Sequence, residues 1–67
     1  MRDIGEKIKT ERELKGLTQK ELGEALGLAS NTICQYEKNS RHPSLECIVL
    51  LADFFNVTTD YLLGRED

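Results

Sequence analysis

Apolar residues recur every three or four positions along nearly the whole chain, which is the period of amphipathic α-helices. Ile4 and Ile8 begin one stripe, which Arg12 continues, and the residues between them are good helix formers. The longest stripe consists of Leu45, Ile48, Leu51, Ala52 and Phe55. We find no alternating pattern of the kind that predicts a β-strand. The sequence therefore predicts an all-α fold, a compact five-helix bundle that forms a single domain over residues 1–67.

The first two helices are separated by a glycine. The first helix is expected over residues 3–15, and Gly16 ends it. Thr18 and Glu21 then have the spacing of a capping box, in which two side chains satisfy free N–H groups at the start of a helix. A second helix is therefore predicted over about 19–26.

A third helix follows after a link of only three residues. Gly27 stands where a helix needs a left-handed residue to end. The spacing of Ile33, Tyr36 and Glu37 predicts the next helix over about 30–38. Two helices joined by so tight a turn form a helix-turn-helix unit, whose second helix enters the major groove of DNA in known examples.

The C-terminal half begins with a loop and contains two more helices. Pro43 disfavours helix in the residue before it, so residues 39–43 are expected to form the loop. Ser44 is expected to cap a fourth helix, which includes the longest apolar stripe. Thr58 is expected to cap a short fifth helix that Gly64 ends.

Composition argues against several classes of function. A chain of 67 residues holds one small core and has little room for the walls of a large active-site cleft, so we expect no enzyme. Cys34, Cys47 and the single histidine, His42, cannot supply a four-ligand zinc site. No apolar run is long enough for a signal peptide or a membrane span. We therefore expect a cytoplasmic protein with two reduced thiols and without a metal, cofactor, membrane or small-molecule partner.

The net charge of −3 is unfavourable for a polyanionic partner, but its distribution is uneven. Residues 1–27 carry six Lys/Arg and six Asp/Glu, residues 28–45 carry two and one, and residues 46–67 carry one and five. The three balances are therefore 0, +1 and −4. The acidic third can face away from DNA while the middle of the chain faces it.

The motifs over nearly the whole chain resemble those of the phage repressor/Cro-type family, also called XRE-like. The matching residues are Ile8, Arg12, Gly16-Leu17-Thr18-Gln19, Leu22-Gly23, Leu26-Gly27-Leu28, Thr32-Ile33, Tyr36-Glu37, Pro43-Ser44-Leu45 and Val57-Thr58-Thr59-Asp60-Tyr61-Leu62-Leu63-Gly64. The resemblance implies a lambda repressor-like DNA-binding domain. It implies a transcriptional regulator, a repressor of a phage, mobile element or bacterial operon, which binds an operator of double-stranded DNA.

Two residues depart from the family pattern. Ala29 stands where a Ser or Thr usually caps the recognition helix, and alanine is a poor cap. If Ser30 caps the helix instead, the contacts at its start shift by one residue. Gly23 replaces a commoner alanine and weakens the second helix, but it also leaves a spot without a side chain where the third helix crosses.

The outward face of the third helix carries the residues expected to contact bases. With Ile33, Tyr36 and Glu37 facing inward, the opposite face presents short polar side chains. Carboxamides can pair with adenine, a hydroxyl can serve most bases, and a thiol can touch a thymine methyl group. The expected base contacts are therefore Ser30, Asn31, Cys34 and Gln35. The alternative is an ordinary solvated helix surface.

Phosphate contacts are implied partly by the resemblance. It assigns this role to Gln19, Thr32, Asn39 and Arg41, and Lys38 adds a second cation near the loop. Each of these residues also has an ordinary interpretation. Gln19 can be a first-turn helix residue, and Lys38 and Arg41 can be solvated charges.

Arg12 and Glu37 are expected to form a buried ion pair, because each lies on an otherwise apolar stripe and a buried charge needs a partner. The alternative is two separate surface charges. The resemblance supports the pair.

Leu50 and Phe54 lie off the core face of the fourth helix. With Val49 or Tyr61 nearby, they are expected to form a homodimer interface. Such a dimer would place two recognition helices on successive major grooves of a pseudo-palindromic operator. Alternatively, the fifth helix or a further C-terminal segment covers them.

Two other functions remain open at this stage. An antitoxin or a restriction-modification control protein of the same fold also binds an operator. A protein-interaction module without DNA binding is compatible with the acidic net charge.

Overall fold

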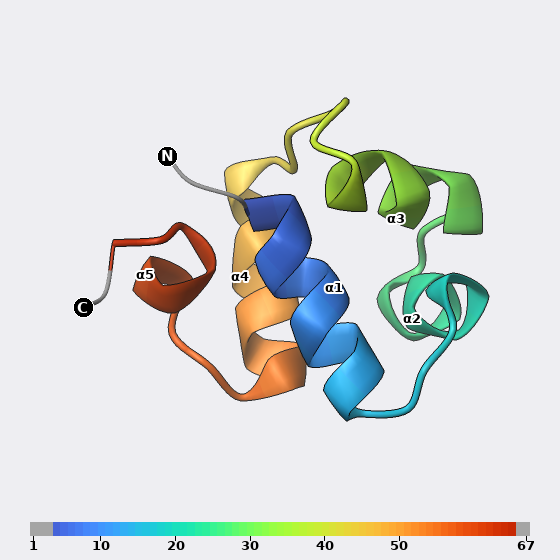
Figure 1. The fold of residues 1–67 in the computed structure, drawn as a ribbon, viewed down its shortest axis with the longest axis horizontal. Coiled ribbons are helices and arrows are strands. Elements are labelled where there is room, and N and C mark those ends of the chain that lie inside the picture. Colours follow the sequence, from blue (N-terminus) through green and yellow to red (C-terminus); the bar gives the residue numbers. More distant parts are fainter. Residues whose placement is uncertain (1–3, 66–67) are drawn as a thin grey trace.

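The computed structural model describes residues 4–65, which form five α-helices (Figure 1). The helices are α1 (Ile4–Leu14), α2 (Gln19–Leu26), α3 (Ser30–Glu37), α4 (Leu45–Phe55) and α5 (Thr59–Leu62). This part of the chain contains no strand. The predicted all-α class and the order of the helices are therefore confirmed. The third helix ends one residue earlier than expected, because Lys38 is its C-cap.

The helices α2, α3 and α5 are arranged around α1 and α4 (Figure 1). α3 packs against both α2 and α1, while α5 packs against α4 and α1. The helix-turn-helix pair therefore lies on one side of the bundle and α5 lies on the other (Figure 1). Within residues 4–65, no helix is both long and apolar enough to cross a membrane.

All five described helices end with the same backbone arrangement. A left-handed residue follows each helix, and its N–H and that of the next residue bond back to carbonyls of the last turn, which defines a Schellman motif. The left-handed residues are Gly16, Gly27, Asn39, Asn56 and Gly64. The three glycines were predicted as helix ends. The two asparagines were not, although asparagine is the residue that most often replaces glycine in this conformation.

The helix starts follow the predicted caps, with one difference. The hydroxyls of Thr18, Ser44 and Thr58 each accept a hydrogen bond from an N–H of the first turn. The capping box of Thr18 and Glu21 is complete. Ala29 is the N-cap of α3 and contributes no side-chain hydrogen bond. The alternative cap at Ser30 is therefore wrong, and the residues of α3 keep the register that the sequence predicted.

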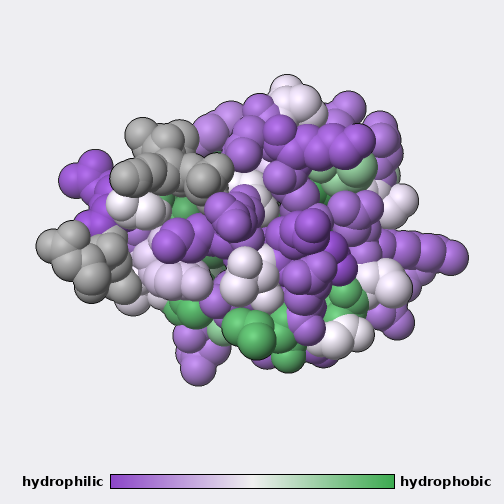
Figure 2. Space-filling model, in the orientation of Figure 1, coloured by the Kyte–Doolittle hydropathy of each residue, from purple (hydrophilic) through white to green (hydrophobic). Residues whose placement is uncertain are grey.

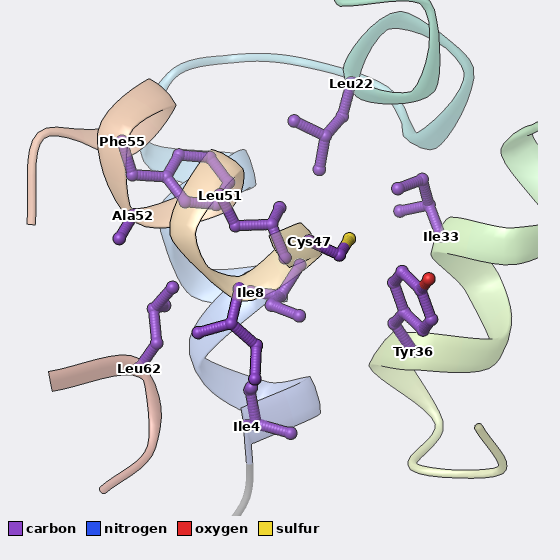
Figure 3. Packing of buried hydrophobic residues seen from close by; sticks show 11 residues of the cluster. Ile4, Ile8, Leu22, Ile33, Tyr36, Cys47, Leu51, Ala52, Phe55 and Leu62 are labelled. Carbon is purple, nitrogen blue, oxygen red and sulfur yellow. The ribbon is translucent and has the colours of Figure 1, made fainter. Parts of the chain in front are cut away.

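The core lies where α1, α3, α4 and α5 meet, with Leu22 reaching it from α2 (Figure 3). Ile8, Leu22, Ile33, Leu51 and Leu62 are fully buried at its centre. One predicted core position is wrong, because Leu45 is 72% exposed. Leu45 is the first residue of α4, and burial on this face begins two residues later with Cys47, whose side chain belongs to the core cluster (Figure 3).

Gly23 allows the close contact between α2 and the turn that follows it. A Cβ atom at this position would lie 2.5 Å from the backbone oxygen of Leu28 and 3.3 Å from the carbonyl carbon of Ala29. The predicted spot without a side chain therefore exists, but the backbone of the turn occupies it. The absence of a side chain at Gly23 therefore permits the path by which the chain enters α3.

Candidate nucleic-acid interface

α3 presents a polar face away from the core. Ile33 and Tyr36 are buried, whereas Ser30 and Asn31 are exposed at the start of the helix. Cys34 and Gln35 are half-buried on the next turn. Within the part of the chain that the structure describes, the side chains of Asn31 and Gln35 make no hydrogen bond, so their donors and acceptors are available. The structure therefore places all four predicted base-contacting residues on accessible positions of one short helix.

Arg12 and Glu37 hold α3 against α1 from the opposite side. Arg12 Nε donates to Glu37 Oε2 over 2.7 Å, and a terminal nitrogen of Arg12 donates to Oε1 over 3.1 Å. Their side chains are only 11% and 4% exposed. Hydrogen bonding to Glu37 raises the pKa of Arg12 above its already high value. The structure thus brings together the two residues that were expected to pair, in a bidentate geometry shielded from water.

Gln19 connects α2 to the ion pair of Arg12 and Glu37. Its Nε2 donates to Glu37 Oε1 over 3.0 Å, so one carboxylate of α3 binds side chains from both α1 and α2. A carboxamide nitrogen carries two hydrogens, and the second remains available. This arrangement fixes Gln19 at the first turn of α2, where helix N–H groups and their partial positive charge favour an anion.

The remaining predicted phosphate contacts lie on or after α3. Thr32 is half-buried in its first turn, while Lys38, Asn39 and Arg41 are exposed at its end. The structure therefore places the predicted set at three points of the helix-turn-helix unit: Gln19 in the first turn of α2, Thr32 in the first turn of α3, and the other three residues after the last turn of α3. Asn39 is more constrained than expected, because its Oδ1 accepts a hydrogen bond from the backbone N–H of Gly5 over 3.1 Å.

Gly5 was not singled out from the sequence. A Cβ atom there would lie 2.5 Å from the backbone oxygen of Tyr36 and 2.6 Å from that of Glu37. The start of α1 therefore touches the end of α3 directly. A glycine inside a predicted helix was the available signal, since glycine lowers helix propensity and often has a packing reason.

The predicted dimer residues have different surroundings. Leu50 is 51% exposed, and Phe54 is half-buried with the ammonium of Lys15 over its ring at 5.8 Å. Tyr61 is half-buried and is engaged within the chain, since its hydroxyl donates to Glu11 over 2.9 Å and Lys7 lies over its ring. The hydrogen bond to Glu11 raises the pKa of Tyr61. Leu50 is therefore the most accessible of the three.

The side chains of the candidate interface are suited to binding a ligand through hydrogen bonds and charge. Along residues 4–65, His, Cys, Asp and Glu do not gather into a group of three or more that could hold a metal ion. Cys34 and Cys47 are both free thiols. The outward groups of α3 and the following loop are instead hydrogen-bond donors, acceptors and two cations, which suit base edges and phosphates.

Comparisons with known proteins agree with this geometry. The fold matches a crystal structure of the P22 c2 repressor in complex with a synthetic operator, with a TM-score of 0.89 and 27% identity, over 98% of this chain and 100% of that one. The HTH-type transcriptional regulators ImmR and AnsR of Bacillus subtilis are 38% and 44% identical over 64 and 55 residues, which cover 96% and 82% of the chain. The chain spans about half the length of these two relatives, 50% and 47%. A family model described as helix-turn-helix matches residues 8–62, and the chain therefore belongs to this helix-turn-helix family.

Proposed function

We propose that the protein binds double-stranded DNA sequence-specifically and regulates transcription, most simply as a repressor that occupies an operator. The observation that carries this proposal is the outward face of α3, where uncommitted polar side chains stand on a helix fixed by α1 and α2. The similarity to the P22 c2 repressor, which was crystallised with a synthetic operator, supports the same function. The protein would act on DNA in the cytoplasm.

Within this proposal, the two groups of side chains have different tasks. Ser30, Asn31, Cys34 and Gln35 contact base edges in the major groove, where carboxamides and hydroxyls distinguish base pairs. Phosphates are bound by Gln19, Thr32, Lys38, Asn39 and Arg41, which set the register of α3 on the duplex. The arrangement of the surface is consistent with this assignment, because the surface over α2 and α3 in Figure 2 is mostly hydrophilic.

The salt dependence of binding distinguishes the proposed function from that of a protein-interaction module without DNA binding. Lys38 and Arg41 of two copies would neutralise about four phosphates, so the logarithm of the association constant should fall with that of salt concentration with a slope of roughly −3.6. Fluorescence anisotropy of a labelled duplex, titrated at several salt concentrations, measures the slope. Absence of binding at low salt, or a slope near zero, would contradict the proposed function.

We further propose that the protein acts as a homodimer on a pseudo-palindromic operator. Apolar surface gathers along the lower edge of the molecule in Figure 2, beneath the C-terminal ends of α1 and α4. Leu50, Phe54 and Tyr61 are the residues proposed for the interface, and Leu50 is the most exposed of the three. A two-fold axis there would place two α3 helices on successive turns of one face of the DNA.

Leu50→Glu should abolish the dimer, because it places a charge in the proposed apolar contact. Leu45→Glu is the matched control, since Leu45 is also exposed on α4 but lies on a different side of that helix. Sedimentation equilibrium measures both variants against the wild type. A wild-type monomer at high micromolar concentration that also stays a single copy on operator DNA would refute the homodimer.

A further inference from the structure

Asn39 occupies a backbone position that glycine fills at the ends of three other helices. Its φ angle is +60°, and the left-handed conformation costs energy for any residue with a side chain. Asn56 occupies the same position after α4, also with a φ angle of +60°. The two differ in what their side chains do. Within residues 4–65, Asn39 makes a side-chain hydrogen bond and Asn56 makes none.

The partner of Asn39 lies 34 residues away in the first turn of α1. The first N–H groups of an α-helix have no acceptor within the helix, and Gly5 carries one of them. Asn39 Oδ1 supplies that acceptor at 3.1 Å. The side chain of the residue that ends α3 therefore acts as a cap for α1.

This hydrogen bond is part of a direct contact between the two helix ends. The backbone oxygens of Tyr36 and Glu37 would lie 2.5 and 2.6 Å from any Cβ atom at Gly5, so only glycine permits the approach. Helix N-termini carry partial positive charge and helix C-termini partial negative charge, which makes the contact favourable. The last turn of α3 is thereby held against the first turn of α1.

The rest of α3 is fixed by other contacts. The turn that Gly23 accommodates fixes its N-terminal end, and the Arg12–Glu37 pair fixes its inner face. The contact between Gly5 and Asn39 fixes its C-terminal end, next to Lys38 and Arg41. The orientation of α3 therefore depends on several contacts, and the one at its C-terminal end includes a single side-chain hydrogen bond.

We propose that Asn39 is a positioning residue for DNA recognition, which sets the angle of α3 through its hydrogen bond to Gly5. This inference rests on the proposed function. It predicts that the oxygen of the Asn39 side chain is needed for sequence discrimination, in addition to any contact that its NH2 group makes with a phosphate.

Three variants separate this role from general stability. Asn39→Gly keeps the left-handed backbone and removes the side chain. Asn39→Asp keeps an oxygen acceptor for Gly5, and Asn56→Gly is the matched control at the equivalent position of α4. The measured quantity is the ratio of the dissociation constants for a random duplex and a selected operator, at a temperature where all variants are folded.

The ratio should fall about fivefold in Asn39→Gly, the factor that one lost hydrogen bond typically produces. It should stay at the wild-type value in Asn56→Gly. Asn39→Asp should weaken binding to both duplexes through its added charge but keep the ratio. In the free protein, hydrogen exchange of the Gly5 amide should accelerate in Asn39→Gly and not in Asn39→Asp.

An unchanged ratio in Asn39→Gly, or unchanged exchange of the Gly5 amide, would overturn the positioning role alone. The role is also overturned if Asn39→Asp loses as much discrimination as Asn39→Gly. A wild-type protein that binds random and selected duplexes equally would instead overturn the proposed function, and this inference with it.

Discussion

Replacing Glu37 by alanine should lower the free energy of unfolding by about 3 kcal/mol, at the lower end of the range for breaking a buried ion pair. The substitution leaves the guanidinium of Arg12 in a largely dry site, with the backbone oxygen of Leu17 as a remaining close acceptor. It also removes the acceptor of Gln19. A domain of this size has a total stability of roughly 3–10 kcal/mol, so the loss is a large part of it. Urea denaturation followed by circular dichroism measures it.

Two further variants make this prediction specific. Glu24→Ala, at an exposed position of α2, should change stability by less than about 0.5 kcal/mol. Combining Glu37→Ala with Arg12→Met should cost less than the two single changes added together, because the uncompensated charge is gone. A loss below about 1 kcal/mol in Glu37→Ala would mean that the pair is not buried as described.

Gln35→Ala and Arg41→Ala should impair DNA binding in different ways. Gln35 stands on the outward face of α3, so its removal should relax the preference at one base pair of each half-site, at a cost of about 1–3 kcal/mol. Arg41 is exposed in the loop after α3, and its removal should weaken all duplexes alike and reduce the salt slope by about one unit. Binding titrations with operator, singly substituted operators and random duplexes separate the two patterns.

Equal weakening of operator and random duplexes by Gln35→Ala would mean that α3 does not contact bases through this residue. The cap at Ala29 rules out one explanation for such a result. Because α3 begins at Ser30, a shift of one residue in the helix start is not available to account for it.

Much of the fold was predictable because local rules and tertiary packing agree in this chain. Gly16, Gly27 and Gly64 end α1, α2 and α5 where the sequence predicted ends, and Thr18, Ser44 and Thr58 cap the starts of α2, α4 and α5. Such signals depend on a few neighbouring residues, so they can be read from sequence. Leu45 was placed wrongly because helical period identifies a face and does not reveal at which residue along that face burial begins.

The long-range contacts of the candidate site were harder to predict. The apolar stripes indicated that Arg12 and Glu37 need partners, so the pair could be inferred from burial. The contact between Gly5 and Asn39 involves backbone approach across 34 residues, for which one sequence gives no distance information. The same holds for Gln19, whose bond to Glu37 depends on how α2 and α3 cross.

Selection of bound sequences from a pool of random duplexes shows whether α3 reads DNA sequence. The wild-type protein should enrich a set of related sites, with two half-sites of inverted symmetry whose centres lie about 10 base pairs apart. Enrichment of sites without symmetry would contradict the proposed homodimer but would agree with sequence-specific binding. A bound pool with the same composition as the starting pool would contradict the claim that α3 reads DNA sequence.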